Sequence, residues 1–173
     1  RQACPALGPR FYGWMRCRVL LLSLAVGVAG LRAKELFVAP DGADESPGTL
    51  AKPLASLMRA QALAEPGDTV WIRGGVYQLK PDRIAREHRV WTYIHEFRKS
   101  GKPGQPIRYW AYQAEKPVFD CTEVNPPGRR VNAFQVAGSW LHFRGFEVIG
   151  TQVNFKGHGQ SCNFEIQGGH NIL

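Results

Sequence analysis

The first 33 residues of the chain contain no acidic side chain, although they hold five arginines. The whole chain has 22 basic and 14 acidic residues, a net charge of +8. Residues 34–173 keep 17 of the basic and all 14 of the acidic residues, so their net charge is only +3. This near balance removes the case for a nucleic-acid-binding protein, because such a protein needs a concentrated basic surface.

Long hydrophobic runs are also absent, apart from the twelve residues 19–30, which only Ser23 interrupts. A helix of this length rises about 1.5 Å per residue and cannot cross about 30 Å of hydrocarbon, which argues against a stable membrane anchor. The run follows a cationic segment that starts at Met15 and precedes the small residue Ala33. This layout predicts a secretory signal peptide over residues 15–33, with an uncleaved anchor or a buried helix as the alternatives.

The predicted signal peptide divides the chain into three parts. We expect residues 1–14 to be untranslated upstream sequence and residues 34–173 to be the exported part of a secreted, extracellular protein. Cysteine is scarce, and only Cys121 and Cys162 belong to the exported part. A disulfide between them is permitted outside the cell. Two separate thiols are equally compatible with the sequence, because pairing requires Cα atoms within about 7 Å.

The exported part is predicted to begin with a strand, a loop that contains aspartates, and a helix. A short apolar strand is predicted at residues 36–39, and the spacing of Asp41 and Asp44 resembles a calcium loop. The glycine and glutamate that complete an EF-hand are missing, which favours Asx turns that close on their own backbone. A helix is predicted to start at Pro53 and to end at residues 65–68. Its apolar side consists of Leu54, Leu57, Met58 and Ala64.

Short strands separated by glycine follow the predicted helix. They are expected at residues 69–73, 76–77, 107–112 and 117–119. Residues 78–106 carry seven basic and three acidic side chains, and we interpret them as a long excursion with one short strand near residues 90–94. A solvated basic loop is the favoured interpretation of this segment, and a surface for an acidic ligand is the alternative.

The last 40 residues contain an internal repeat. Residues 134–140 match residues 164–170 at an offset of 30, in the order aromatic, polar, β-branched, small or polar, glycine, small and ring-bearing. Short strands at a fixed period without intervening helices predict a solenoid of stacked β-coils. A β-sandwich is the alternative, but it would show more two-residue hairpin signals.

The sequence around these elements resembles a known family. Residues 36–42, 46–53, 66–70 and 73–77 are similar to the amino-terminal start of secreted right-handed parallel β-helix proteins. Residues 140–148, 157–164 and 168–172 are similar to the pectate lyases of polysaccharide lyase family nine. The resemblance implies an all-β fold, a right-handed parallel β-helix with a short amino-terminal capping α-helix. It also implies that residues 34–173 are the amino-terminal part of a longer domain, truncated at the C-terminus.

The resemblance further implies a calcium-dependent β-elimination that cleaves polygalacturonate, with clustered aspartates as calcium ligands and a lysine as the base. No aspartate follows Asp120, and Lys156 is the only lysine after Lys116. The remaining aspartates are Asp41, Asp44, Asp68 and Asp82. No position therefore matches the family's calcium ligands or base, and Lys156 is interpreted as a solvated loop residue. We expect these groups beyond Leu173, an inactive fragment on its own, and a monomer that binds an acidic polysaccharide.

Two other functions stay open at the level of sequence. A glycoside hydrolase on the same scaffold would use paired carboxylates, for which Glu147 and Glu165 are the candidates, although Glu165 is expected to point outward as a solvated residue. A non-catalytic β-helix could bind polysaccharide through stacked aromatics. The candidates are Trp71, Trp91, Trp110 and Trp140, although core positions are favoured for them. The histidines His142, His158 and His170 lack metal-ligand spacing and are expected to be structural.

Overall fold

The computed structural model of the chain describes residues 33–151 and 161–173. Residues 1–14, the predicted signal peptide up to residue 32, Lys156 and His158 lie outside this part of the chain. No helix within the described residues is long and apolar enough to cross a membrane.

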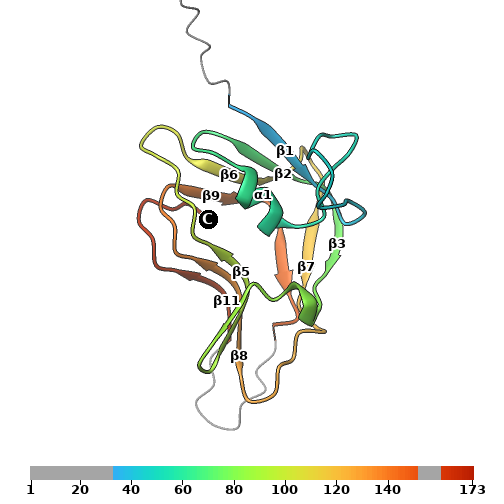
Figure 1. Ribbon diagram of the computed structural model, residues 1–173, viewed down its shortest axis with the longest axis vertical. Helices are drawn as coiled ribbons and strands as arrows, with labels where there is room; N and C mark the ends of the chain where they lie inside the picture. The colour runs from blue at the N-terminus through green and yellow to red at the C-terminus, as the bar shows by residue number, and fades with distance from the viewer. Residues whose placement is uncertain (1–32, 152–160) are drawn as a thin grey trace, which may run out of the picture. The chain divides into compact units, whose positions relative to one another are not determined.

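The strands form three sheets arranged around one solenoid (Figure 1). The first sheet contains β1 (Glu35–Val38), β2 (Thr69–Ile72), β6 (Ile107–Ala111) and β9 (Leu141–Arg144) in this order. The second sheet contains β3 (Gly75–Gln78), β7 (Pro117–Asp120) and β10 (Glu147–Ile149). The third sheet contains β4 (Arg86–His88), β5 (Trp91–Phe97), β8 (Arg130–Val136) and β11 (Cys162–Ile166). Every pair of neighbouring strands is parallel except β4 and β5, which form an antiparallel hairpin.

Each coil visits the three sheets in turn, so that β2, β3 and β5 form the first coil, β6, β7 and β8 the second, and β9, β10 and β11 the third. Strands β8 and β11 pair with Phe134 opposite Phe164, which is the predicted offset of 30. The two phenylalanine rings stack with centroids 4.8 Å apart. The prediction of a parallel β-helix is therefore confirmed, and the sandwich alternative is wrong.

The glycines of the repeat mark the turn between the third and first sheets. A Cβ on Gly138 would overlap the carbonyl oxygen of Lys99, and a Cβ on Gly168 would overlap the carbonyl oxygen of Gly138. Successive coils thus approach so closely at this turn that only glycine fits. Two residues further on, Trp140 and His170 both have positive φ angles, 59° and 57°, and their rings stack 4.2 Å apart.

The interior of the solenoid is filled largely by stacked aromatic rings. Tyr109 of β6 stacks on Phe143 of β9 at 5.1 Å, and Tyr77 of β3 stacks on Phe119 of β7 at 4.7 Å. Because identical faces of parallel strands repeat from coil to coil, each ring meets a ring in the next coil. Phe97 joins the sheets, since it contacts both Tyr109 and Phe143 edge-on.

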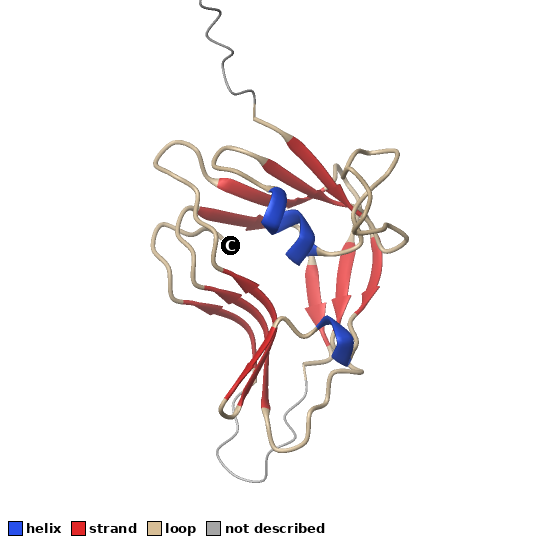
Figure 2. Cartoon of the chain, in the orientation of Figure 1, coloured by secondary structure: helices blue, strands red, loops and turns tan. Residues whose placement is uncertain are grey.

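The helix α1 (Leu57–Leu63) caps one end of this interior, as predicted (Figures 1 and 2). Leu57 and Ala60 are buried, and the helix contacts β1 and β5. The predicted start at Pro53 is four residues too early. Leu54 instead pairs with β1, because its N–H donates to Phe37 and its carbonyl oxygen accepts from Ala39. The Ser56 hydroxyl then caps the helix by accepting from the backbone N–H of Arg59.

The loop before the helix does not contain the predicted local Asx turn at Asp44. Its carboxylate accepts hydrogen bonds from the backbone N–H groups of Ala55 and Ser56 and from the Ser56 hydroxyl. These partners lie eleven and twelve residues along the chain. Asp44 therefore ties the loop to the start of α1, a contact that only the tertiary fold creates.

The prediction of a long excursion over residues 78–106 is wrong in part. The segment does contain the 3₁₀ turn η1 (Pro81–Arg83) and the short strand β4. However, β5 is longer than predicted and pairs along its length with β8 in the third sheet. Ile94 and Phe97 are fully buried. Within β5 only Glu96 is charged, so the many charges of the segment lie on either side of this core strand.

Candidate functional site

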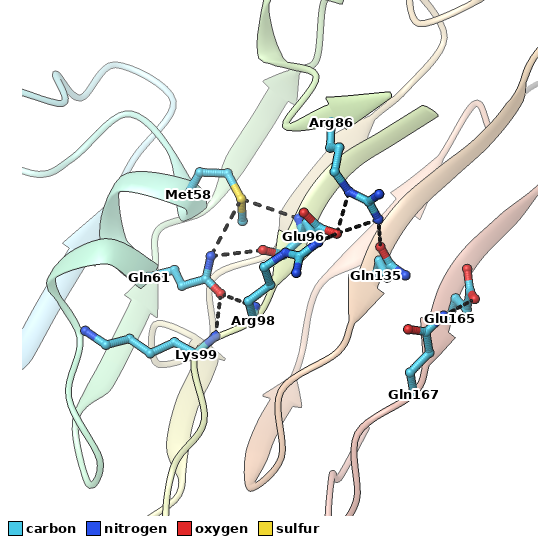
Figure 3. Close-up of polar contacts among 9 residues, drawn as sticks. All are labelled: Met58, Gln61, Arg86, Glu96, Arg98, Lys99, Gln135, Glu165 and Gln167. Carbon is cyan, nitrogen blue, oxygen red and sulfur yellow. Dashed lines mark hydrogen bonds and ion pairs between the residues drawn. The ribbon is translucent and has the colours of Figure 1, made fainter. Parts of the chain in front are cut away.

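The outer face of the third sheet carries a row of polar side chains that the stacked coils bring into register (Figure 3). Glu96 of β5 lies beside Gln135 of β8, and Gln135 lies beside Glu165 of β11. Neighbouring parallel strands are about 4.8 Å apart, so the three side chains form a continuous line along the solenoid. Glu96 and Gln135 are only 9% and 3% exposed, so the row is a largely covered polar network.

Two arginines hold the Glu96 carboxylate at the start of this row. Arg86 of β4 donates through Nε to Oε1 at 2.8 Å, and Arg98 donates through Nη2 to the same oxygen at 2.8 Å. Arg86 also donates to the amide oxygen of Gln135 at 3.3 Å. Burial alone would raise the pKa of Glu96, but the hydrogen bonds from Arg98 and Arg86 outweigh it and keep that pKa below its usual value. Glu96 is therefore an ionised structural anchor rather than a proton donor.

The capping helix α1 forms hydrogen bonds with the end of the same strand, β5. Gln61 donates to the backbone carbonyl of Glu96 at 3.0 Å, and its amide oxygen accepts from the N–H of Arg98 at 2.8 Å (Figure 3). The Met58 sulfur accepts from the N–H of Glu96 at 3.4 Å. These contacts lock the helix to the edge of β5, so the polar row has a rigid base.

Glu165 at the other end of the row is only partly exposed, which corrects the expectation of an ordinary solvated residue. Its carboxylate accepts hydrogen bonds from the amides of Asn132 and Gln167. Tyr93 lies nearby with the Arg86 guanidinium 4.4 Å from its ring. Burial, and next to it the negative charge of Glu165, raise the pKa of the Tyr93 hydroxyl. The row therefore holds two carboxylates whose oxygens already have amide or guanidinium partners.

Four of the seven basic residues in segment 78–106 form ion pairs with other described residues, so the interpretation of a solvated basic loop holds only in part: Arg83 and Arg98 are paired but remain exposed. Besides Arg86 and Arg98, Arg83 lies 3.7 Å from the Asp44 carboxylate and Lys99 lies 2.8 Å from Glu65. The pKa of Glu65 is lowered by the hydrogen bond and the charge of Lys99. Most of the charge in this segment is thus used within the protein.

The tryptophans occupy positions opposite to the favoured interpretation. All four are partly exposed, namely Trp71, Trp91, Trp110 and Trp140. Trp71 and Trp110 lie on the outer face of the first sheet, where their strand neighbours Val70, Ile72 and Tyr109 point inward and are fully buried. The signal was present in the sequence, because Trp71 alternates with aliphatic residues and shares its face with Thr69 and Arg73.

The aspartates of the described residues do not gather into a metal site. No group of three or more His, Cys, Asp and Glu side chains within residues 33–151 and 161–173 could hold a metal ion. Asp68 accepts from the N–H groups of Lys34 and Glu65, and Asp120 accepts from Thr122. The hydrogen bonds from Thr122 lower the pKa of Asp120. These carboxylates stabilise turns, so the described residues do not fit a calcium ion.

The candidate hydrolase pair is not brought together. Glu147 belongs to β10 of the second sheet, whereas Glu165 belongs to β11 of the third sheet. Of the histidines, His142 lies on the outer face of the first sheet and His170 stacks on Trp140. Burial and the charge of Arg108 lower the pKa of His142. No carboxylate pair for hydrolysis is formed by the two predicted residues.

One buried titratable group, His95, was not predicted from the sequence. His95 of β5 lies fully inside the solenoid, where its ring packs against Phe134 at 4.6 Å and its Nδ1 meets the carbonyl oxygen of Ala133 at 3.1 Å. Burial lowers the pKa of His95 to about 4. The imidazole is therefore neutral and serves packing.

A cavity of about 660 Å³ lies beneath α1 and η1, and both His95 and Tyr77 line it. Burial raises the pKa of the Tyr77 hydroxyl, which donates to backbone carbonyls.

Cys121 and Cys162 are free thiols. Cys121 is buried, and burial raises its pKa to about 11; burial also raises the pKa of Cys162. Raised pKa values disfavour the thiolate, so neither residue has the character of a nucleophile. Of the two alternatives, separate thiols are the one that the structure contains.

The fold and register now allow a comparison with known proteins. A family model described as the Pel9A-like, right-handed β-helix region matches residues 36–173. The chain belongs to the Pel9A-like right-handed β-helix family. The resemblance seen in the sequence is thereby confirmed, and so is the right-handed form of the predicted solenoid.

Three proteins of known name are similar to this chain. Pectate lyase L of Dickeya chrysanthemi is 30% identical over 133 residues, which are 75% of this chain and 29% of that protein. The solved structure of a rhamnogalacturonan lyase matches 80% of this chain and 34% of its own, with 36% identity and a TM-score of 0.77. The crystal structure of pectate lyase Pel9A matches 68% of this chain and 28% of its own, with 30% identity and a TM-score of 0.51.

These relatives are lyases by name. This chain spans between 28% and 34% of the length of these proteins. The activity of the whole protein is therefore a matter for proposal.

Proposed function

We propose that the protein is an exported polysaccharide lyase that cleaves polygalacturonate by β-elimination. The observation that carries the proposal is the match of residues 36–173 to the Pel9A-like family, together with relatives named as pectate lyases.

The chemistry requires groups that the described residues do not offer. In β-elimination a base removes the proton α to the uronate carboxylate, the C4–O4 bond breaks, and a double bond forms between C4 and C5. We propose that the base and the calcium ligands lie outside residues 33–151 and 161–173. The described part then contributes the capped start of the solenoid and the rigid polar row of the third sheet.

A second substrate is supported by a specific observation. The rhamnogalacturonan lyase structure has both a higher TM-score and a higher identity to this chain than pectate lyase Pel9A has. Rhamnogalacturonan also contains galacturonate, so the same elimination would apply to it. We therefore keep rhamnogalacturonan as the alternative substrate of the same reaction.

The test is an assay of the full-length protein with polygalacturonate and with rhamnogalacturonan, each with and without a calcium chelator. We expect ultraviolet-absorbing unsaturated ends from polygalacturonate, and their loss with the chelator. Product from rhamnogalacturonan alone would change the substrate but keep the lyase. New reducing ends without ultraviolet absorbance would identify a hydrolase, and binding without any product would identify a non-catalytic β-helix.

A further inference from the structure

The outer face of the first sheet carries aromatic rings and arginines that the proposed lyase chemistry does not use. They come from three neighbouring strands, β2, β6 and β9, and from the residue that follows β6. We call this set the cation–aromatic surface, and it consists of Trp71, Arg108, Trp110, Tyr112 and Arg144. All five side chains are partly or fully exposed.

Trp110 is the centre of this surface. The guanidinium of Arg144 lies 4.1 Å from its ring centroid and that of Arg108 lies 5.6 Å from it. Trp71 meets Trp110 edge-on at 6.0 Å, and Tyr112 meets Trp71 edge-on at 5.9 Å. The register explains the arrangement, because Trp71 pairs with Trp110 and Trp110 pairs with Arg144 across successive coils.

The two arginines that flank Trp110 keep their charge available. Within residues 33–151 and 161–173, neither Arg108 nor Arg144 lies within ion-pair distance of a carboxylate. Arg108 donates only to the backbone carbonyl of Gly67, at 3.2 Å. Glu35, the nearest acid in this sheet, is engaged by the indole N–H of Trp71 at 3.0 Å. The surface therefore combines open positive charge with exposed aromatic faces.

Hollows adjoin the rings on two sides. One of about 580 Å³ is lined by Phe37, Leu50, Trp71, Tyr112 and Arg144, among others. Another of about 510 Å³ is lined by Arg108, His142 and the stacked pair Trp140 and His170, among others. Because Arg144 and Arg108 both contact the Trp110 ring, the two hollows adjoin one continuous surface.

We propose that the cation–aromatic surface is a binding site for a chain of acidic polysaccharide. Aromatic rings pack well against the apolar C–H faces of sugar rings, and guanidinium groups form charge-assisted hydrogen bonds with carboxylates. Trp71, Trp110 and Arg144 lie in line across successive coils, and Arg108 lies beside Trp110 on β6, so one surface supplies both kinds of contact. The choice of a uronate-containing chain as the ligand rests on the proposed function.

Charge also argues against a second copy of this chain as the occupant. A two-fold dimer would place the same patch against itself, so the unpaired arginines of both copies would face one another. Like charges in contact oppose association, whereas a polyanionic chain relieves the repulsion and gains from it. A polysaccharide with carboxylates therefore fits the surface better than a self-complementary interface.

The test is a titration of the full-length protein with polygalacturonate in the presence of a chelator, followed by tryptophan fluorescence. The double variant Arg108→Gln/Arg144→Gln is compared with the control Lys80→Gln/Lys116→Gln, which removes the same charge from exposed loop residues next to β3 and β7. We expect the first variant to bind about tenfold more weakly, since two charge-assisted contacts are lost, and the control to stay within about twofold.

The aromatic contribution is tested with Trp110→Ala and Trp110→Phe. We expect Trp110→Ala to lose binding by about tenfold and Trp110→Phe to retain part of it, because a smaller ring still stacks. Circular dichroism melts show whether each variant is folded. Equal weakening in both double variants, unchanged binding in every variant, or a dimer that Trp110→Ala dissociates would overturn the proposal.

The outcome is separable from that of the proposed function. If the full-length protein yields unsaturated products but Arg108→Gln/Arg144→Gln binds and cleaves polygalacturonate like the wild type, the surface proposal fails and the lyase stands. If no substrate gives product while the variant still loses binding, the lyase proposal fails and the surface stands.

Discussion

The outer faces of the third and first sheets carry similar numbers of arginines, but they use them in opposite ways. On the third sheet Arg86 and Arg98 converge on one oxygen of Glu96. On the first sheet Arg108 and Arg144 lie over Trp110 without a carboxylate partner among the described residues. A basic side chain therefore indicates a ligand-binding site only where no carboxylate of the protein pairs with it.

The two faces also differ in burial. Glu96 is only 9% exposed, because the β4–β5 hairpin and α1 cover it. Arg144 is exposed at the end of β9. We therefore expect the charges of the third sheet to support folding and those of the first sheet to support binding. Three predictions test this contrast, from the largest expected effect to the smallest.

Replacing Glu96 with glutamine should destabilise the protein strongly, because it leaves two guanidinium groups without their anion. We expect a loss of about 2–3 kcal/mol in the free energy of unfolding, below the value for a fully buried pair since Arg98 is mostly solvated. Urea denaturation measures the effect. The control Glu87→Gln removes an exposed pair with Arg129, 3.3 Å long, and should cost less than about 1 kcal/mol. Equal losses would show that the third sheet does not depend on Glu96.

Acidification should destabilise the protein through His95, which lies behind the third sheet. Its pKa is 6.5 when unfolded and about 4 when folded, so the unfolded state binds more protons between these values. The stabilisation is complete above pH 6.5 and decreases as the pH falls towards 4. Between pH 7.5 and 5 we expect a loss of about 2 kcal/mol in the free energy of unfolding.

Two variants test whether His95 causes this pH dependence of the free energy of unfolding. His95→Asn keeps a donor for Ala133 but cannot titrate, so its unfolding free energy should vary much less between these two pH values. His142→Asn on the outer face of the first sheet should keep almost the full dependence, since His142 is only partly buried. An unchanged dependence in His95→Asn would contradict the burial of a neutral imidazole. The carboxylates with lowered pKa values lose their contribution mainly below this pH window.

Replacing Arg144 with glutamine should lower the free energy of unfolding by only about 0.5 kcal/mol, because an exposed cation–π contact contributes little. Arg98→Gln is the matched variant on the third sheet, and it should cost about 1 kcal/mol since Glu96 loses one of its two partners. Urea midpoints at pH 7.5 compare the two. A larger cost for Arg144→Gln than for Arg98→Gln would reverse the proposed division of roles.

Most strands could be predicted because their signals are local. Alternating side chains marked β2 and β6, and the glycines at 138 and 168 revealed the period of the last coils. Strand β5 was underestimated because Glu96 and Arg98 give its end the composition of a loop. Their apolar neighbour Phe97 is fully buried, and the Glu96 carboxylate is paired with Arg98 and with Arg86 of the β4–β5 hairpin.

The candidate site was less predictable than the fold. The start of α1 was placed too early, because the pairing of Leu54 with β1 is a contact between distant segments. The row from Glu96 to Glu165 required the register of three strands that are widely separated in sequence. The Trp71 and Trp110 faces could have been found from alternation alone, had their strand neighbours Thr69 and Arg108 been used to orient them.

The sequence by itself determined most of the strands and the offset of 30 in the last repeat, because side-chain alternation and turn residues are local properties. Only the tertiary structure decided which charged side chains form ion pairs and which remain unpaired. The reason is that ion pairing depends on the distance between segments that the chain connects through many residues. Arg86 is neutralised and Arg144 is not, although nothing in their immediate sequence distinguishes the two.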